Sequence, residues 1–314
     1  MMQGGATLLK ETSALLESGE YLTALDSLRE GLTELRAGAS SNEWRTFCAQ
    51  TFATHEFSLH PLSSLLRAGP LGSVCAKTAR GAIHHPFALD VIYGLDTVPE
   101  DLTPTANALR KWELELGFCV SLRRRRLLLA RELNELGAAV RYPRVLAVGC
   151  GHLREAAAAL SLPGMHGGEL VAFDRDRDSL NLIQSEYEYP GLRTLSGSLR
   201  DAIANDPTLG RFDLIYLPTV LDTLEDFRSS ALLADVLPLL ESGGRLIATN
   251  FSPDLRDAAF LEACLDWWPF YRDEQKLAAL LSQLPVANLR GHAMFREGSS
   301  EEQGGSVFLD LQAL

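Results

Sequence analysis

The sequence predicts an α/β protein in which a helical region comes first and a doubly wound, mostly parallel seven-stranded sheet follows. Leucine and alanine recur at helical spacing before Tyr142, whereas short apolar runs alternate with helical stretches after it. Two further strand patterns close the chain around a polar loop at residues 297–305, which predicts an antiparallel hairpin at a sheet edge. We therefore expect a helical N-terminal cap and lid in residues 1–140 and an α/β domain in residues 141–314.

The first helices are indicated by apolar positions separated by breakers. Residues 8–16 and 21–35 predict a helical hairpin, because Ser18 and Gly19 interrupt the pattern between them. A helix over residues 42–53 follows a small-residue linker, and His60-Pro61 marks a later break. Residues 106–136 predict one broken helix or two consecutive helices.

Four consecutive arginines, residues 123–126, lie within this last helical stretch. Such a run could contact phosphate or nucleic acid, but charged runs beside apolar residues are more often the solvated face of a helix. We interpret the run as a solvated face.

Strands alternate with helices from Tyr142 onward. The predicted strands are residues 145–148, 169–173, 193–197, 212–217 and 244–251, followed by the hairpin strands 287–295 and 306–312. The predicted helices between them are residues 154–160, 177–187, 199–205 and 229–240. This alternation is typical of a parallel sheet with crossover helices.

Composition excludes several classes of protein. The 314 residues carry a formal net charge of -12, which disfavours a nucleic-acid binder. Five cysteines without a Cys-x-x-Cys pair indicate neither a disulfide framework nor a zinc site, and we expect no metal. No apolar run is long enough to span a bilayer and no secretory leader is evident, so we expect a cytoplasmic protein with a small-molecule substrate. The sequence leaves the oligomeric state open.

The most informative stretch is a glycine turn directly after the first predicted strand. Gly149 and Gly151 bracket Cys150, and a helical stretch begins after Leu153. Dinucleotide-binding turns have a third glycine where this chain has Arg154, which disfavours NAD and FAD. Asp174 ends the second strand, where a carboxylate can accept hydrogen bonds from both ribose hydroxyls. A nucleoside ligand without phosphates fits this pattern, and S-adenosylmethionine is the expected cofactor.

The sequence resembles the Rossmann-type (class I) S-adenosylmethionine-dependent methyltransferases. Within them it is similar to the branch of extracellular-factor 3-hydroxypalmitic acid methyl ester biosynthesis proteins. The residues that carry the resemblance are 80–81, 90–94, 150–155, 212–216, 243–246, 250–251, 266–268 and 271–272. The chain departs from the branch at residues 82–85 and 218–221, so the branch's acyl acceptor is not carried over.

The expected cofactor site lies at the carboxyl ends of the strands. Its residues are Gly149, Cys150, Gly151, His152, Asp174, Arg175, Ser198, Leu217 and Pro218. His152 is expected to shape the turn or touch the methionine end of the ligand. Ser198, Leu217 and Pro218 follow the third and fourth strands, positions that flank the adenine in this fold.

Five residues are candidates for binding or activating the methyl acceptor: His84, His85, Tyr93, Asn250 and Tyr271. A carboxylate acceptor needs no general base, whereas a hydroxyl acceptor would benefit from a histidine. The two histidines could instead end a helix, and the tyrosines could be core or lid aromatics.

We expect a methyltransferase acting on a small molecule of secondary or signal metabolism. Two alternatives stay open at this point. The enzyme could attack another sulfonium carbon, as in an intramolecular cyclisation that releases methylthioadenosine. The chain could also be an inactive S-adenosylmethionine-binding scaffold, because Ala147 and Leu153 stand where the general turn often has an acid and a third glycine.

Overall fold

The chain forms two compact units in a computed structural model. The structure describes residues 2–77, 86–96, 103–159, 167–201, 206, 209–282, 284, 289–296 and 305–314. Unit 1 comprises Met1–Leu122 and Arg256–Trp268, and unit 2 comprises Arg123–Leu255 and Pro269–Leu314. The sequence places a boundary at residue 140, whereas the division between the units falls at residue 122, inside a helix.

The regular elements of unit 1 are all helices in its described residues. Its helices are α1 (Met2–Glu17), α2 (Tyr21–Ala37), α3 (Ser41–Thr51), α4 (His55–Ser58), α5 (Pro61–Ala68), α6 (Pro70–Lys77), α7 (Pro86–Ile92), α8 (Pro104–Leu114), the start of α9 (Gly117–Ala139), and α14 (Ala258–Cys264). Helices α1 and α2 form the predicted hairpin, and a Cβ added at Gly31 would lie 2.5 Å from the side chain of Leu8. Ser40 and Glu43 form a capping box that fixes the start of α3.

Helix α14 joins unit 1 although it lies far along the chain. Glu262 is buried and accepts hydrogen bonds from Arg36 Nε at 2.8 Å and from the indole Nε1 of Trp44 at 2.6 Å. Asp257, just before the helix, accepts a hydrogen bond from the backbone N–H of Gly117 at 2.7 Å. These buried polar contacts hold the segment against the N-terminal helices.

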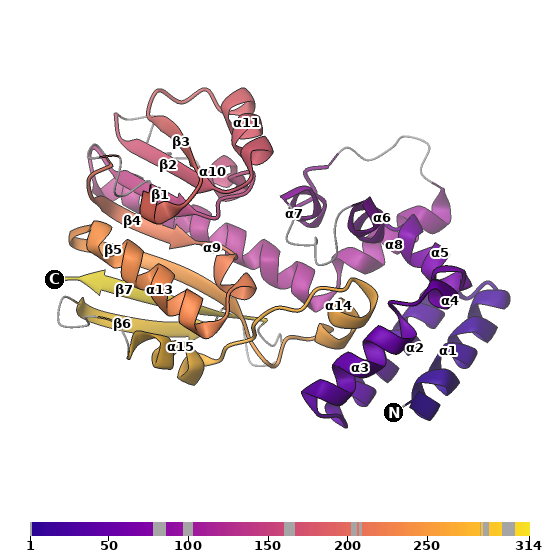
Figure 1. Cartoon of the computed structure of the whole chain (residues 1–314). Helices are drawn as coiled ribbons and strands as arrows, with labels where there is room; N and C mark the ends of the chain where they lie inside the picture. The colour runs from indigo at the N-terminus through magenta and orange to yellow at the C-terminus, as the bar shows by residue number, and fades with distance from the viewer. Residues whose placement is uncertain are drawn as a thin grey trace. The chain divides into compact units, whose positions relative to one another are not determined.

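Unit 2 contains one sheet of seven strands, as predicted (Figure 1). The strands are β1 (Arg144–Val148), β2 (Glu169–Asp174), β3 (Leu192–Ser196), β4 (Phe212–Leu217), β5 (Leu240–Phe251), β6 (Leu289–Arg296) and β7 (Ser306–Ala313). Their order is β3-β2-β1-β4-β5-β7-β6. Strands β1 to β5 are parallel, and β7 pairs antiparallel with both β5 and β6. The order reverses between β1 and β4, which is where open α/β sheets bind their ligands.

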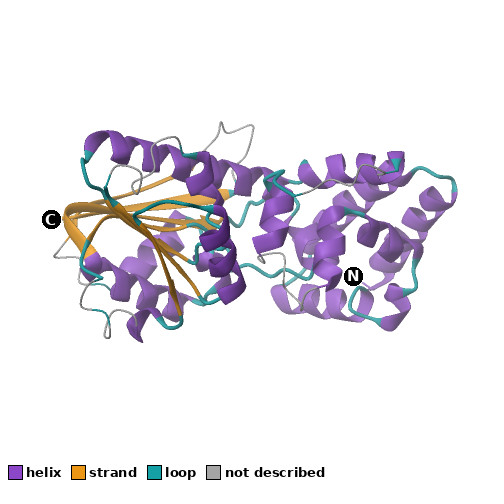
Figure 2. Ribbon diagram, turned by 90° about the horizontal axis from the view of Figure 1, so that it is seen from above, coloured by secondary structure: helices purple, strands orange, loops and turns teal. Residues whose placement is uncertain are grey.

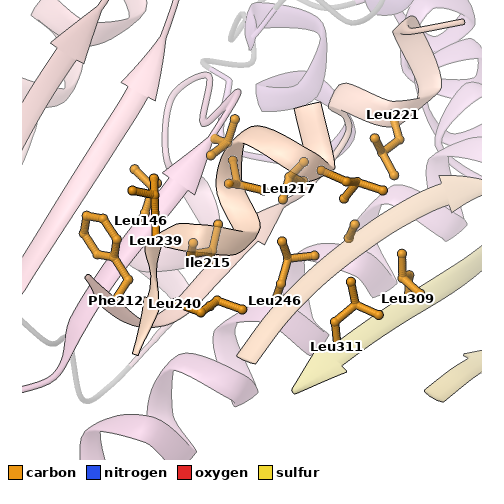
Figure 3. Packing of buried hydrophobic residues seen from close by; sticks show 14 of the residues in the cluster. Leu146, Phe212, Ile215, Leu217, Leu221, Leu239, Leu240, Leu246, Leu309 and Leu311 are labelled. Atoms are coloured by element: carbon orange, nitrogen blue, oxygen red, sulfur yellow. The ribbon is translucent and has the colours of Figure 1, made fainter. Parts of the chain in front are cut away.

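Helices cover both faces of this sheet (Figure 2). They are α9 after Leu122, α10 (Arg154–Ala158), α11 (Arg177–Glu186), α13 (Asp226–Val236) and α15 (Glu274–Leu281), with the short 3₁₀ helices η3 (Val220–Thr223) and η4 (Leu237–Leu239). Successive side chains of a strand point to opposite faces. Leu146 accordingly belongs to one buried cluster with residues of α13 and α15, and Figure 3 shows it with Phe212 and Ile215 of β4. Val145 belongs to another cluster with residues of α9 and α11.

Two described elements of unit 2 have boundaries that differ from the predicted ones by three or four residues. Strand β5 begins at Leu240 rather than Gly244, because a register shift between Phe212 and Leu214 lets the pairing with β4 start earlier. The predicted helix over residues 229–240 is α13, which runs from Asp226 to Val236. The 3₁₀ helix η4 follows it because Pro238 has no backbone N–H for a continued α-helix. Of the described helices, none is long and apolar enough to cross a membrane.

Candidate functional site

The glycine turn after β1 has the backbone geometry that the sequence predicts. Gly149 and Gly151 have φ of 67° and 50°, in the left-handed region that favours glycine. The N–H groups of Gly149 and Cys150 both donate to the carbonyl of Phe173, at 2.8 and 3.2 Å. The end of β2 therefore holds the turn in place.

Asp174 is bound to the same turn by its side chain. Its Oδ2 accepts a hydrogen bond from the backbone N–H of Gly151 at 2.8 Å, and its Oδ1 accepts one from the N–H of Asp176 at 2.9 Å. The carboxylate is half-buried. A carboxylate has about four lone-pair sites, so each oxygen can still accept one further hydrogen bond. The glycine turn and Asp174, which we expect to bind the same nucleoside, are thus in direct contact.

Leu153, the residue before α10, adopts a left-handed conformation with φ of 56° although it is not a glycine. Its side chain is fully buried among residues of the sheet face that α9 covers, and this packing offsets the backbone cost. The hydroxyl of Tyr187 lies 3.3 and 3.4 Å from the carbonyl oxygens of His152 and Leu153 and shares its one hydrogen between them. Arg126 Nε donates to the carbonyl of Arg154 at 3.0 Å. The turn is therefore supported from beneath.

Two buried titratable groups belong to the turn and to the helix α10 that follows it. The Glu155 carboxyl accepts a hydrogen bond from the hydroxyl of Tyr216 at 2.8 Å, and burial raises its pKa above the ordinary range. Burial also raises the pKa of the Cys150 thiol, with the carboxylate of Asp174 a smaller cause. A thiol with a raised pKa is a poor nucleophile. Cys150 therefore contributes to the packing of the turn.

The other predicted cofactor residues lie at the same edge of the sheet. Asp174 is paired in register with Ser196 of β3, and Ser198, two residues further, is exposed. Leu217 is the last residue of β4, which lies next to β1, and Pro218 follows it; both are buried. A Cβ added at Gly149 would lie 3.2 Å from Val220, which follows them. Arg175 is exposed, and His152 is buried in the turn.

Asn250 and Tyr271 occupy the end of β5 and the segment after α14. The Asn250 amide is fully buried: its Oδ1 accepts from Arg272 Nη1 at 2.7 Å, and its Nδ2 donates to the carbonyl of Phe270 at 2.6 Å. Arg272 is 1% exposed and also donates to the carbonyls of Leu221 and Leu224. Tyr271 is half-buried beside this network.

The interpretation of residues 123–126 as a solvated face is wrong for Arg125. Its side chain is 1% exposed, and its Nη1 lies 2.5 Å from Oδ2 of Asp222, which is also fully buried. Its Nε donates to Ser306 Oγ at 2.6 Å, and its guanidinium lies 4.0 Å from the ring centroid of Phe251. The apolar stripe of α9 could have revealed this, since Arg125 lies three residues after the buried Leu122 and four before the buried Leu129.

The three remaining candidates lie outside the described residues or outside unit 2. His84 and His85 lie outside the described residues. Tyr93 follows α7 in unit 1 and is half-buried. In the described part of the chain, no group of three or more His, Cys, Asp or Glu side chains is placed to hold a metal ion.

Substituting Gly149 by alanine is expected to lower the free energy of unfolding by about 1–2 kcal/mol, because a left-handed φ is unfavourable for alanine. The new Cβ would also press on Val220. Urea unfolding followed by circular dichroism measures the effect. Gly291→Ala is the control, since a Cβ there meets nothing within 4 Å. Equal losses in both variants would contradict a conformational requirement at Gly149.

Comparison with known proteins finds solved structures of similar fold. No family model and no curated protein matches the sequence. A possible exported protein from Bordetella parapertussis aligns over 88% of this chain and 98% of its own, with a TM-score of 0.58 and 14% identity.

Two further solved structures are methyltransferases by name. The CurJ carbon methyltransferase aligns over 87% of this chain and 70% of its own, with a TM-score of 0.52 and 14% identity. A candidate methyltransferase from Thermobifida fusca aligns over 82% of this chain and 99% of its own, with a TM-score of 0.52 and 16% identity. At such identities the likeness shows the fold, which is the Rossmann-like methyltransferase fold.

Proposed function

We propose that the chain is an S-adenosylmethionine-dependent methyltransferase whose acceptor is a small molecule with a carboxylate or hydroxyl group. The observation that carries the proposal is the hydrogen bond between the Gly151 N–H and the Asp174 carboxylate at the carboxyl edge of β1 and β2. It fixes an acid beside a glycine turn at the point where the strand order reverses. This is the arrangement that recognises a nucleoside in open α/β sheets.

The residues of this edge fit the proposed cofactor. The free acceptor capacity of Asp174 suits two ribose hydroxyl donors. Gly149 and Gly151 have no side chains, so a ligand can approach the backbone of the turn closely. The supports beneath the turn, Leu153 and Tyr187, keep these groups in position before a ligand arrives. A preorganised site of this kind loses less entropy on binding.

S-adenosylmethionine would supply a methyl group on a sulfonium sulfur, which is a good leaving group for an in-line displacement. The protein's own part is then to orient the acceptor about 3 Å from the methyl carbon and to exclude water. A carboxylate acceptor would need only positioning, whereas a hydroxyl acceptor would need a base such as the proposed His84 or His85. The resemblance to one methyltransferase branch supports the cofactor and leaves the acceptor open.

Asp174→Ala is expected to weaken binding of S-adenosylmethionine by roughly 100-fold or more, because two hydrogen bonds to a charged acceptor are lost. Isothermal titration calorimetry with S-adenosylmethionine and S-adenosylhomocysteine measures the loss. Asp178→Ala is the matched control, since this carboxylate is exposed on the nearby first turn of α11. Circular dichroism of the variants without ligand separates lost binding from lost folding.

The reaction itself is tested by mass analysis of the nucleoside product. The wild-type protein is incubated with S-adenosylmethionine alone and then with a panel of carboxylic acids and alcohols. Acceptor-dependent formation of S-adenosylhomocysteine supports methyl transfer. Release of methylthioadenosine alone would overturn the proposal in favour of cyclisation, and failure of the wild type to bind either nucleoside would overturn the cofactor as well.

A further inference from the structure

Unit 1 contains an open cavity that the proposed cofactor site does not use. Its volume is about 600 Å³, and it is lined by residues of α3, α4, α5 and α14 and by residues just after α3 and α14. Phe52, Phe57 and Trp268 form aromatic walls, with the rings of Phe52 and Phe57 in edge contact at 4.9 Å between centroids. Cavities of about 300–1,000 Å³ with aromatic walls are typical of small-molecule sites.

Two arginines at this cavity have no carboxylate partner among the described residues. The Arg45 guanidinium lies 4.4 Å from the ring centroid of Trp268. The indole is itself fixed, because its Nε1 donates to Asp266 Oδ1 at 3.0 Å. Arg67 donates from Nη2 to the carbonyl of Ser58 at 2.9 Å. Both guanidiniums are exposed and keep N–H donors that can bind an anion.

The acidic residues of the cavity do not cancel this charge. Glu262 also lines it, but its carboxylate is neutralised by a bidentate contact with Arg36, at 2.8 and 3.0 Å. Asp266 is the other carboxylate in the lining, and it accepts the hydrogen bond from the Trp268 indole. The pair of Arg36 and Glu262 is neutral, so the charges that remain at the cavity are those of Arg45, Arg67 and Asp266. Together these three side chains carry a net charge of +1. A positive cavity in a chain of net charge -12 favours an anionic ligand.

The two thiols of the cavity add apolar surface. Burial, with smaller contributions from Glu262 and Asp266, raises the pKa of the Cys48 thiol to about 12. Burial likewise raises the pKa of Cys264. Both side chains are therefore neutral near pH 7, and a neutral cysteine packs as a small hydrophobic residue.

We propose that this cavity binds a small organic anion with a planar aromatic body. Its carboxylate contacts Arg45 and Arg67, and its ring packs against Trp268, Phe52 and Phe57. The site belongs to unit 1, whereas the proposed nucleoside site belongs to unit 2. Planar guanidiniums match the geometry of a carboxylate, and stacked aromatic rings add to the burial of apolar area.

The test uses the full chain with two probes of one shape. Calorimetry with naphthoate and with neutral naphthamide measures the contribution of the charge. We expect naphthoate to bind roughly 10-fold more tightly or better at low salt, with the advantage falling as salt is added. The double variant Arg45→Gln/Arg67→Gln should reduce naphthoate to the affinity of naphthamide. Trp268→Leu should weaken both probes.

Arg131→Gln is the control for general charge, since this exposed arginine on α9 belongs to unit 2 and does not line the cavity. Equal affinity of the wild type for the two probes, no binding of naphthoate, or unchanged naphthoate affinity in the double variant would each overturn the proposal. The probe comparison needs no variant, so it stands even if a substitution harms folding. Binding of S-adenosylhomocysteine, measured in parallel, keeps failure of the nucleoside site distinguishable.

Discussion

Arg125→Met is expected to lower the free energy of unfolding of unit 2 by about 3–5 kcal/mol, because the buried Asp222 carboxylate loses its hydrogen-bonded cation and keeps Arg272 only as a neighbouring charge. Asp222 is fully buried. After the substitution its Oδ1 would still accept the hydrogen bond from the backbone N–H of Phe251, at 2.6 Å, but its Oδ2 would lose the hydrogen bond from Arg125. The hydrogen bond of Arg125 to Ser306 would be lost as well. Methionine fills much of the same volume, so the loss reports the charge more than a cavity.

Chemical denaturation followed by far-ultraviolet circular dichroism measures this loss, and hydrogen exchange at the Phe251 amide localises it. Arg131→Met is the control on the same helix: its side chain is 56% exposed, and surface pairs contribute about 0–1 kcal/mol.

A double-mutant cycle isolates the charge pair. Asp222→Asn removes the negative charge, and the oxygen of the new amide could still accept from the Phe251 N–H. This substitution should therefore be better tolerated in the Arg125→Met background than in the wild type, with a coupling of about 0.5–3 kcal/mol. The same cost in both backgrounds would show that the pair is not coupled.

Sequence patterns predicted those parts of the fold and of the candidate site that depend on residues close together in the sequence. The glycine turn, Asp174 and the alternation of strands with helices are each encoded within a few residues, because strand faces and turns have short-range signatures. The seven-stranded sheet and its antiparallel end followed from them.

Contacts between distant residues could not be predicted in the same way. Asn250 is held by Arg272, 22 residues away, and Glu262 is held by Arg36, 226 residues away. Nothing near Asn250 in the sequence distinguishes a buried amide that joins two segments from one that faces a ligand. The burial of Arg125 could be predicted in part. Its spacing from Leu122 and Leu129 on the helix indicates a buried position, whereas the three arginines beside it indicate an exposed one.

A buried acid in unit 1 predicts a second large effect, on the pH dependence of stability. The Glu113 carboxyl is 2% exposed and accepts a hydrogen bond from the backbone N–H of Leu71 at 3.1 Å, at the start of α6. Burial raises its pKa to about 8, and the backbone hydrogen bonds oppose the shift only in part. The folded state therefore holds this proton more tightly than the unfolded chain, where the pKa is about 4.5.

The sign of the effect follows from linkage. Unfolding releases the proton between these two pKa values, so stability falls as pH rises from about 4.5 to 8 and levels off above that. The total loss is roughly 5 kcal/mol at 1.36 kcal/mol per pKa unit, as an order of magnitude. Glu113→Gln removes the titrating group and keeps one acceptor oxygen for Leu71. The variant should gain stability relative to the wild type as pH rises from 5 to 8.5.

Tryptophan fluorescence can follow this in unit 1 alone, because Trp44, Trp112, Trp267 and Trp268 all belong to it. Urea unfolding at several pH values gives the difference in stability between Glu113→Gln and wild type. The slope of that difference with pH is the decisive quantity, since a weaker hydrogen bond from the Leu71 N–H to the amide oxygen adds only a constant offset. Glu11→Gln removes an exposed carboxyl and controls for net charge. A difference that stays flat from pH 5 to 8.5 would mean that Glu113 is ionised in the folded protein, with the helix start of α6 sufficient to stabilise its charge.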